Sequence, residues 1–133
     1  MIFIDADAFI GISVPLDAHH QEADSRFKQL KEGGEKLATS WDAVDETATK
    51  LSRFTTKKTA IQFLEFLRES SIQVFFIDEK LADEAFRLFS EQTSKRVSLT
   101  DCANMAIARK LGVEVFLSFD DHYRQNGFKL FGD

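Results

Sequence analysis

Four acidic residues, far apart in the sequence, have the chemistry of a metal-binding site. Asp5 and Asp120 each follow a short apolar run, near opposite ends of the chain. Glu46 and Asp101 lie in segments with a helical pattern. Clustered carboxylates repel one another and hold protons with raised pKa values unless a cation neutralises them. Because an all-oxygen ligand set suits Mg²⁺ or Mn²⁺ rather than zinc, these acids are candidate ligands for one of those ions.

Each acid, taken singly, also has a purely structural explanation. Asp5 could end a strand and cap the next helix, although a carboxylate placed directly after an apolar run is costly to bury. Glu46 could form an i,i+4 ion pair with Lys50, worth about 0.3–0.5 kcal/mol. Asp101 completes a capping-box sequence, and Asp120 fits a turn. The metal-site hypothesis therefore depends on all four acids meeting in the fold.

The elements that would bring them together alternate between strand and helix. Five runs rich in β-branched and aromatic residues predict strands, over Ile2 to Asp5, Lys36 to Thr39, Ile72 to Ile77, Val113 to Phe119 and Phe128 to Phe131. Helical periodicity covers Asp17 to Lys31, Thr59 to Arg68, Glu79 to Ser90 and Leu99 to Leu111, with Glu46 in a further helix. We expect an α/β fold with a mostly parallel central sheet of about five strands and helices on both faces. Ligands bind open sheets of this kind at the carboxyl ends of the strands.

Composition limits the class of protein. The chain has 133 residues without repeats or linkers, so we expect one domain over residues 1–133. The net charge of −5 excludes binding to nucleic acid through bulk positive charge. The single cysteine, Cys102, excludes an internal disulfide and indicates a reducing compartment. No apolar run is long enough for a membrane span, and we expect a cytoplasmic protein without a membrane partner.

Four segments also carry a likeness to a known family. They are Ile2–Ile10 (IFIDADAFI), Leu37–Glu46 (LATSWDAVDE), Val97–Ala106 (VSLTDCANMA) and Val115–Tyr123 (VFLSFDDHY). Together they resemble the PIN-domain nucleases, and most closely the small stand-alone toxins of VapC type, over residue 1 to about 131. Three positions depart from the family pattern, with Ser118 in place of Thr, Tyr123 in place of Phe, and Asp7 where Ser, Thr or Asn is usual. Asp7 thereby adds a fifth acid.

The resemblance implies a PIN domain over residues 1–133 that acts as a metal-dependent endoribonuclease. Carried over by position, its catalytic and metal-binding residues are Asp5, Glu46, Asp101 and Asp120. We expect Asp5 and Asp101 to be the principal ligands of Mg²⁺ or Mn²⁺, and the other two to bind the ion directly or through water. Cleavage of RNA would leave a 5′-phosphate and a 3′-hydroxyl. The family also implies the toxin of a type II toxin–antitoxin pair, held inactive by a small antitoxin and often a homodimer.

Positive side chains near these acids are candidate contacts for RNA phosphates. They are Lys50, Arg53, Lys57, Lys58, Lys95, Arg96, Arg109, Lys110 and Arg124, each of which could equally be an ordinary solvated residue. We expect Cys102 to be a small buried side chain. The histidines, His19, His20 and His122, are expected to be surface or turn residues rather than ligands.

Three other interpretations stay open. One is a PIN nuclease that processes RNA without being a toxin. Another is an inactive PIN-like module that binds a partner, which would lack one of the acids. The third is a phosphatase resembling the haloacid dehalogenases, which also begin with a strand and two acids spaced like Asp5 and Asp7. Phe9 disagrees with that family's pattern, and a phosphatase would give no role to Glu46 or Asp101.

Overall fold

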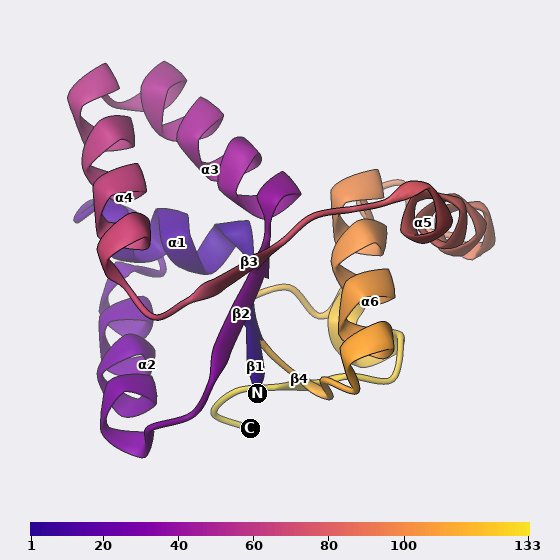
Figure 1. Cartoon of the computed structure of the whole chain (residues 1–133). Coiled ribbons are helices and arrows are strands. Elements are labelled where there is room, and N and C mark those ends of the chain that lie inside the picture. The colour runs from indigo at the N-terminus through magenta and orange to yellow at the C-terminus, as the bar shows by residue number, and fades with distance from the viewer.

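Parallel strands form the centre of the molecule, and helices lie on both sides of them (Figure 1). The computed structural model describes residues 1–133. The strands are β1 (Ile2–Ile4), β2 (Leu37–Ser40), β3 (Gln73–Phe75), β4 (Val115–Leu117) and β5 (Lys129–Leu130). The helices are α1 (Ala6–Ser13), α2 (His20–Gly33), α3 (Trp41–Phe54), α4 (Lys57–Glu69), α5 (Glu79–Glu91), α6 (Leu99–Leu111) and α7 (His122–Gln125).

The alternation of side chains along β1 divides the core into two layers. Ile2 and Ile4 pack with side chains of α1 to α4, among them Phe9 and Phe63. Phe3 points to the opposite face and packs with side chains of α5 and α6. Figure 1 shows the same division, with α1 to α4 on one side of the strands and α5 and α6 on the other. The expected α/β fold with helices on both faces is confirmed.

The strand order β3-β2-β1-β4-β5 places a topological switch beside β1. All neighbouring strands pair in parallel, with Ile2 opposite both Leu37 of β2 and Val115 of β4. The chain runs outward from β1 to β3 and then returns to the other side of β1, so the connections diverge between β1 and β4. Open parallel sheets bind ligands in the crevice at such a point, beyond the carboxyl ends of the strands.

Element boundaries near the N-terminus differ from those expected. Sequence periodicity does not predict α1, which is only 8 residues long and begins directly after β1 and Asp5. The helix expected from Asp17 begins instead at His20. The Asp17 carboxylate accepts the backbone N–H of His19 at 2.9 Å and so stabilises a turn rather than a helix start. Four of the strands are shorter than predicted, β2 has the predicted length but is shifted by one residue, and Asp120 lies beyond the end of β4.

The remaining structural expectations concern α6 and the membrane. Cys102 is fully buried in α6, as expected for a small apolar side chain. The helix ends at Gly112, whose φ of 72° is a left-handed conformation that favours glycine. None of the helices combines the length and apolar character needed to cross a membrane.

Candidate active site

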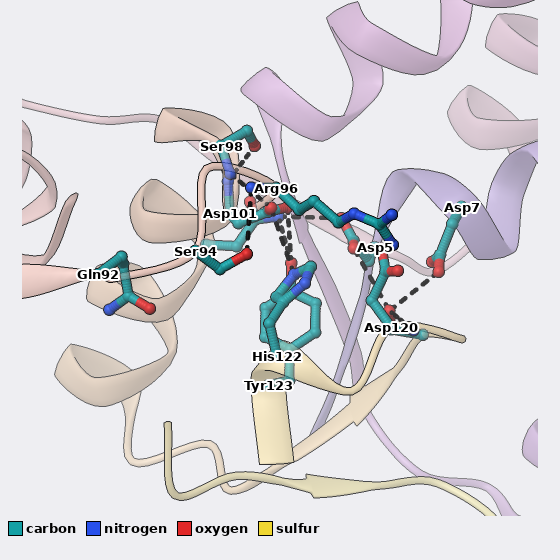
Figure 2. A network of polar contacts seen from close by, with 12 residues as sticks. Asp5, Asp7, Gln92, Ser94, Arg96, Ser98, Asp101, Asp120, His122 and Tyr123 are labelled. Carbon is teal, nitrogen blue, oxygen red and sulfur yellow. Dashed lines mark hydrogen bonds and ion pairs between the residues drawn. The ribbon is translucent and has the colours of Figure 1, made fainter. Parts of the chain in front are cut away.

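The four acids predicted from the sequence line one cavity beyond the carboxyl ends of β1 and β4. This acid cavity has a volume of about 190 Å³. It is lined by Asp5, Asp7, Ile10, Glu46, Lys50, Arg96, Ser98, Asp101 and Asp120. Figure 2 shows the carboxylates that follow β1 and β4 close to those of α1 and α6. The fold therefore joins side chains from separate parts of the chain, as the metal-site hypothesis requires.

Asp5 is the most deeply buried of these acids, with 3% of its surface exposed. Its Oδ1 accepts the N–H of the next residue at 2.7 Å and the side-chain amide of Asn104 at 3.1 Å. The Ser118 hydroxyl donates to its Oδ2 at 3.4 Å. Burial, together with the negative charges of Asp7 and Asp101, raises the pKa of Asp5 well above 3.8. The ionised carboxylate is therefore costly unless a positive charge lies beside it.

Asn104 connects three other parts of the chain, through hydrogen bonds with Asp5, Ser40 and Tyr123. It is fully buried in α6, and its amide nitrogen donates to Asp5 at 3.1 Å and to the Tyr123 hydroxyl at 3.3 Å. Its Oδ1 accepts the Ser40 hydroxyl at 2.5 Å. Ser40 also caps α3, the helix of Glu46, by accepting a backbone N–H at 2.9 Å. Sequence analysis missed Asn104, whose only signal is a single amide within the apolar stretch of α6.

Asp7, the fifth acid, faces the cavity with one free oxygen. Its Oδ2 accepts the backbone N–H of Phe119 at 2.7 Å and the Ser118 hydroxyl at 3.0 Å. Its Oδ1 is buried and has no hydrogen-bond partner. Burial raises the pKa of Asp7 from 3.8 to about 6. One oxygen each from Asp5, Asp7 and Asp120 lie within 4.8 Å of one another, a spacing that suits ligands of a single ion.

Asp101 combines the two roles that the sequence left open. It closes a capping box, since its N–H donates to Ser98 Oγ at 3.0 Å while its Oδ2 accepts the Ser98 N–H at 2.8 Å. The same carboxylate lines the acid cavity and lies 3.2 Å from Nε2 of His122. Burial acts to raise the pKa of Asp101, but the contacts with His122 and the Ser98 N–H outweigh it and hold the pKa below 3.8. The expectation of a surface or turn position for His122 is wrong, because its side chain is 12% exposed and packs against Asp101.

Glu46 and Asp120 form the more exposed wall of the cavity. The Glu46 carboxylate lies 3.9 Å from Lys50 Nζ, the i,i+4 pair expected from the sequence, and still borders the cavity. Burial raises the pKa of Glu46 although Lys50 opposes this. Asp120 does not close β4 as expected, because the preceding Phe119 N–H bonds to a carboxylate instead of a neighbouring strand. Its own N–H donates to Ser118 Oγ at 3.1 Å, which holds Asp120 over the cavity.

The donor atoms of the cavity fit a hard divalent cation. The candidate ligands are all carboxylate oxygens, which Mg²⁺ and Mn²⁺ prefer. A cation would also satisfy the unpartnered Oδ1 of Asp7 and offset the repulsion that raises the pKa of Asp5. The arrangement is therefore suited to holding a metal ion at the edge of the sheet.

Comparison with known proteins agrees with the fold. The family model described as PIN domain matches residues 2–129. The structure is similar to that of VapC20 from Mycobacterium tuberculosis, a sarcin-ricin loop cleaving toxin, with a TM-score of 0.85, 22% identity and 96% of each chain covered. It is also similar to VapBC2 from Rickettsia felis bound to a DNA fragment from their promoter, with a TM-score of 0.71, 13% identity and coverage of 98% of this chain and 97% of that chain. No curated protein matches the sequence.

Proposed function

Because the chain belongs to the PIN domain family, we propose that it is a metal-dependent endoribonuclease that hydrolyses phosphodiester bonds of RNA. One observation supports this best: the four acids expected from the sequence come from separate segments and line the same cavity. A cavity made of carboxylates repels an anionic phosphodiester unless a cation compensates their charge. The proposal therefore includes a divalent metal ion.

We assign Mg²⁺ or Mn²⁺ to the acid cavity. Asp5, Asp7 and Asp120 supply the group of closely spaced oxygens that supports this assignment. Asp101 lines the same cavity as a further direct ligand, and Glu46 would bind the ion directly or through water. When bound, such an ion acidifies a water molecule and stabilises negative charge on the phosphoryl oxygens. Asp5 and Asp101 stay our proposal for the principal ligands, with Asp7 added to the set predicted from the sequence.

The surrounding residues hold these carboxylates in place. Asn104 orients Asp5, and the capping box fixes Asp101, so the two inner acids have little freedom to move. Glu46 and Asp120 lie nearer solvent. They are therefore the residues best placed to orient a water molecule by accepting its hydrogen bond.

For the biological setting, we propose the toxin of a type II toxin–antitoxin pair. The similar structures support this, since one is named as a toxin and the other as a VapBC complex. We therefore expect a small antitoxin partner, a homodimer and a cytoplasmic location. Growth arrest when the chain is expressed alone, relieved by the product of a short reading frame immediately upstream, would support the toxin. An RNA-processing nuclease would not arrest growth.

The two remaining alternatives agree less well with the cavity. A phosphatase of the haloacid dehalogenase type has no use for Glu46 and Asp101, yet both line the same cavity as Asp5. An inactive binding module is expected to have lost one of the acids, and all of them are present.

The test is cleavage of total RNA by the purified chain, with the cut ends mapped by sequencing. We expect cleavage with Mg²⁺ or Mn²⁺ and none with EDTA. Asp5→Asn and Asp101→Asn are each expected to lower the rate at least about a hundredfold while circular dichroism shows a folded protein. Asp45→Asn, which removes an exposed acid of α3, is the matched control and should cleave like the wild type. Undiminished cleavage by both site variants would refute the mechanism.

A further inference from the structure

Only two positive side chains, Lys50 and Arg96, line the acid cavity. Five other cations considered from the sequence lie in separate cavities of α3–α4 and α5–α6 or in surface ion pairs, namely Arg53, Lys57, Arg109, Lys110 and Arg124. Of the nine candidate phosphate contacts, only these two therefore border the acid cavity itself.

These two cations differ in what they already bind. Lys50 lies 3.9 Å from the Glu46 carboxylate. Arg96 borders five carboxylates, yet its guanidinium makes neither an ion pair nor a hydrogen bond, and its only hydrogen bond is made by the backbone. Figure 2 shows the Arg96 side chain extending from its loop toward Asp5 and Asp7. All five N–H donors of the guanidinium are therefore available for a ligand.

The backbone around Arg96 is anchored on both sides. Its N–H donates to Ser94 Oγ at 3.2 Å, and the next N–H, of Val97, donates to the Ser94 carbonyl at 3.3 Å. The Val97 side chain is buried in the core with α5 and α6. Ser98 then begins α6 and shares the capping box with Asp101. The position of Arg96 relative to the acid cavity is thus set by the same short segment that places Asp101.

We propose that Arg96 binds a phosphate group of the RNA substrate at the acid cavity, an inference that rests on the proposed nuclease function. A guanidinium is positively charged and has donors only, so an anion with several acceptor oxygens is the ligand that suits it best. An anion approaches these carboxylates only when a bound cation compensates their negative charge. A phosphodiester that binds to the cation-loaded site meets this condition. The planar fork of arginine matches two phosphate oxygens. Arg96 is then the residue that gives this acidic protein local affinity for RNA.

The test compares Arg96→Ala and Arg96→Lys with Lys36→Ala, which removes an exposed lysine just before β2 that does not line the cavity. Binding is measured by the anisotropy of a fluorescein-labelled RNA of randomised sequence, in Ca²⁺ and over a range of salt concentrations. Arg96→Ala is expected to bind about tenfold more weakly and to lower the salt slope by about 0.7, the value for one lost contact with a single strand. Arg96→Lys should keep the slope, and Lys36→Ala should match the wild type.

Calorimetry with Mn²⁺ alone separates phosphate binding from a role in shaping the metal site. Mn²⁺ affinity is expected to be unchanged or tighter in Arg96→Ala, because the variant removes a positive charge beside the acids. Weaker Mn²⁺ binding, or wild-type RNA affinity and salt slope in Arg96→Ala, would overturn the inference. If the wild type cuts RNA and the arginine variants bind it equally well, the nuclease proposal survives and only the role of Arg96 fails. A wild type that neither binds nor cuts RNA removes both.

Discussion

Replacing Asp7 by Asn is expected to make the fold more stable and cation binding weaker. The bonds that Asp7 accepts from Ser118 and Phe119 can equally be accepted by an amide oxygen. The other atom changes from a buried oxygen without a partner to an uncharged NH₂ group. The variant therefore removes a charge from the acid cavity without removing the contacts that hold the side chain.

The size of the effect follows from the raised pKa of Asp7. Burial raises this pKa from 3.8 to about 6, and each unit corresponds to about 1.4 kcal/mol, so the ionised carboxylate destabilises the fold by about 3 kcal/mol. Because the pKa is higher in the folded than in the unfolded state, Asp7 makes the wild type lose stability as the pH rises from about 4 to about 6. Asn does not ionise. The gain in unfolding free energy on substitution should thus rise from near zero at about pH 4 to about 3 kcal/mol at about pH 8.

The assay is urea unfolding followed by far-UV circular dichroism across this pH range, with EDTA present so that no cation masks the charge. Asp45→Asn serves as control for the loss of an exposed carboxylate, and its stability difference should not change with pH. Calorimetry with Mn²⁺ should show weaker binding to the Asp7 variant. A stability difference that does not vary with pH, or an Asp7→Asn protein less stable than the wild type at about pH 8, would refute the electrostatic reasoning.

Three further predictions follow from the same cavity. Asn104→Ala is expected to lower the free energy of unfolding by about 3 kcal/mol, because Asp5 and Ser40 lose a buried partner; an unchanged urea midpoint would contradict this. His122→Ala removes a contact that lowers the pKa of Asp101. A carboxyl ¹³C titration in EDTA should therefore give a higher pKa for Asp101 in the variant than in the wild type. The stability that the ionised Asp101 contributes at neutral pH should fall with it. Mn²⁺ at about a hundred times its Kd should raise the free energy of unfolding by about 2.7 kcal/mol, and Asp5→Asn should lose most of that gain.

The sequence was enough to predict the fold class and the grouping of the acids. Short apolar strands alternating with helices lead to a parallel sheet, and acids that follow strands then meet at one edge. The i,i+4 spacing correctly indicated an ion pair between Glu46 and Lys50 on α3, and the capping-box pattern correctly placed Asp101 at the start of α6. These features depend on local periodicity and on residue types at fixed spacing, and both can be recognised in the amino-acid sequence.

Features that depend on packing were not predictable in this way. His122 is a polar residue near the C-terminus, and only the approach of α7 to α6 buries it against Asp101. Asn104 lies in an apolar helix, and its three hydrogen bonds reach residues in other elements. The two hydrogen bonds that Asp7 accepts come from Ser118 and Phe119, in the chain that follows β4. Each depends on contacts between distant segments, which spacing in the sequence does not encode.

The pairing of β1 with β4 also has a consequence for synthesis on the ribosome. Ile2 and Val115 are partners in that pairing, so most of the chain separates the two strands that flank the site. Contacts between residues so far apart in the sequence form late, because a long loop must close before they can form. A growing polypeptide therefore lacks the complete set of acids until Asp120 has emerged. If the chain is the RNA-cutting enzyme we propose, the ribosome that makes it is not exposed to a finished nuclease until the segment from β4 to Asp120 has left it.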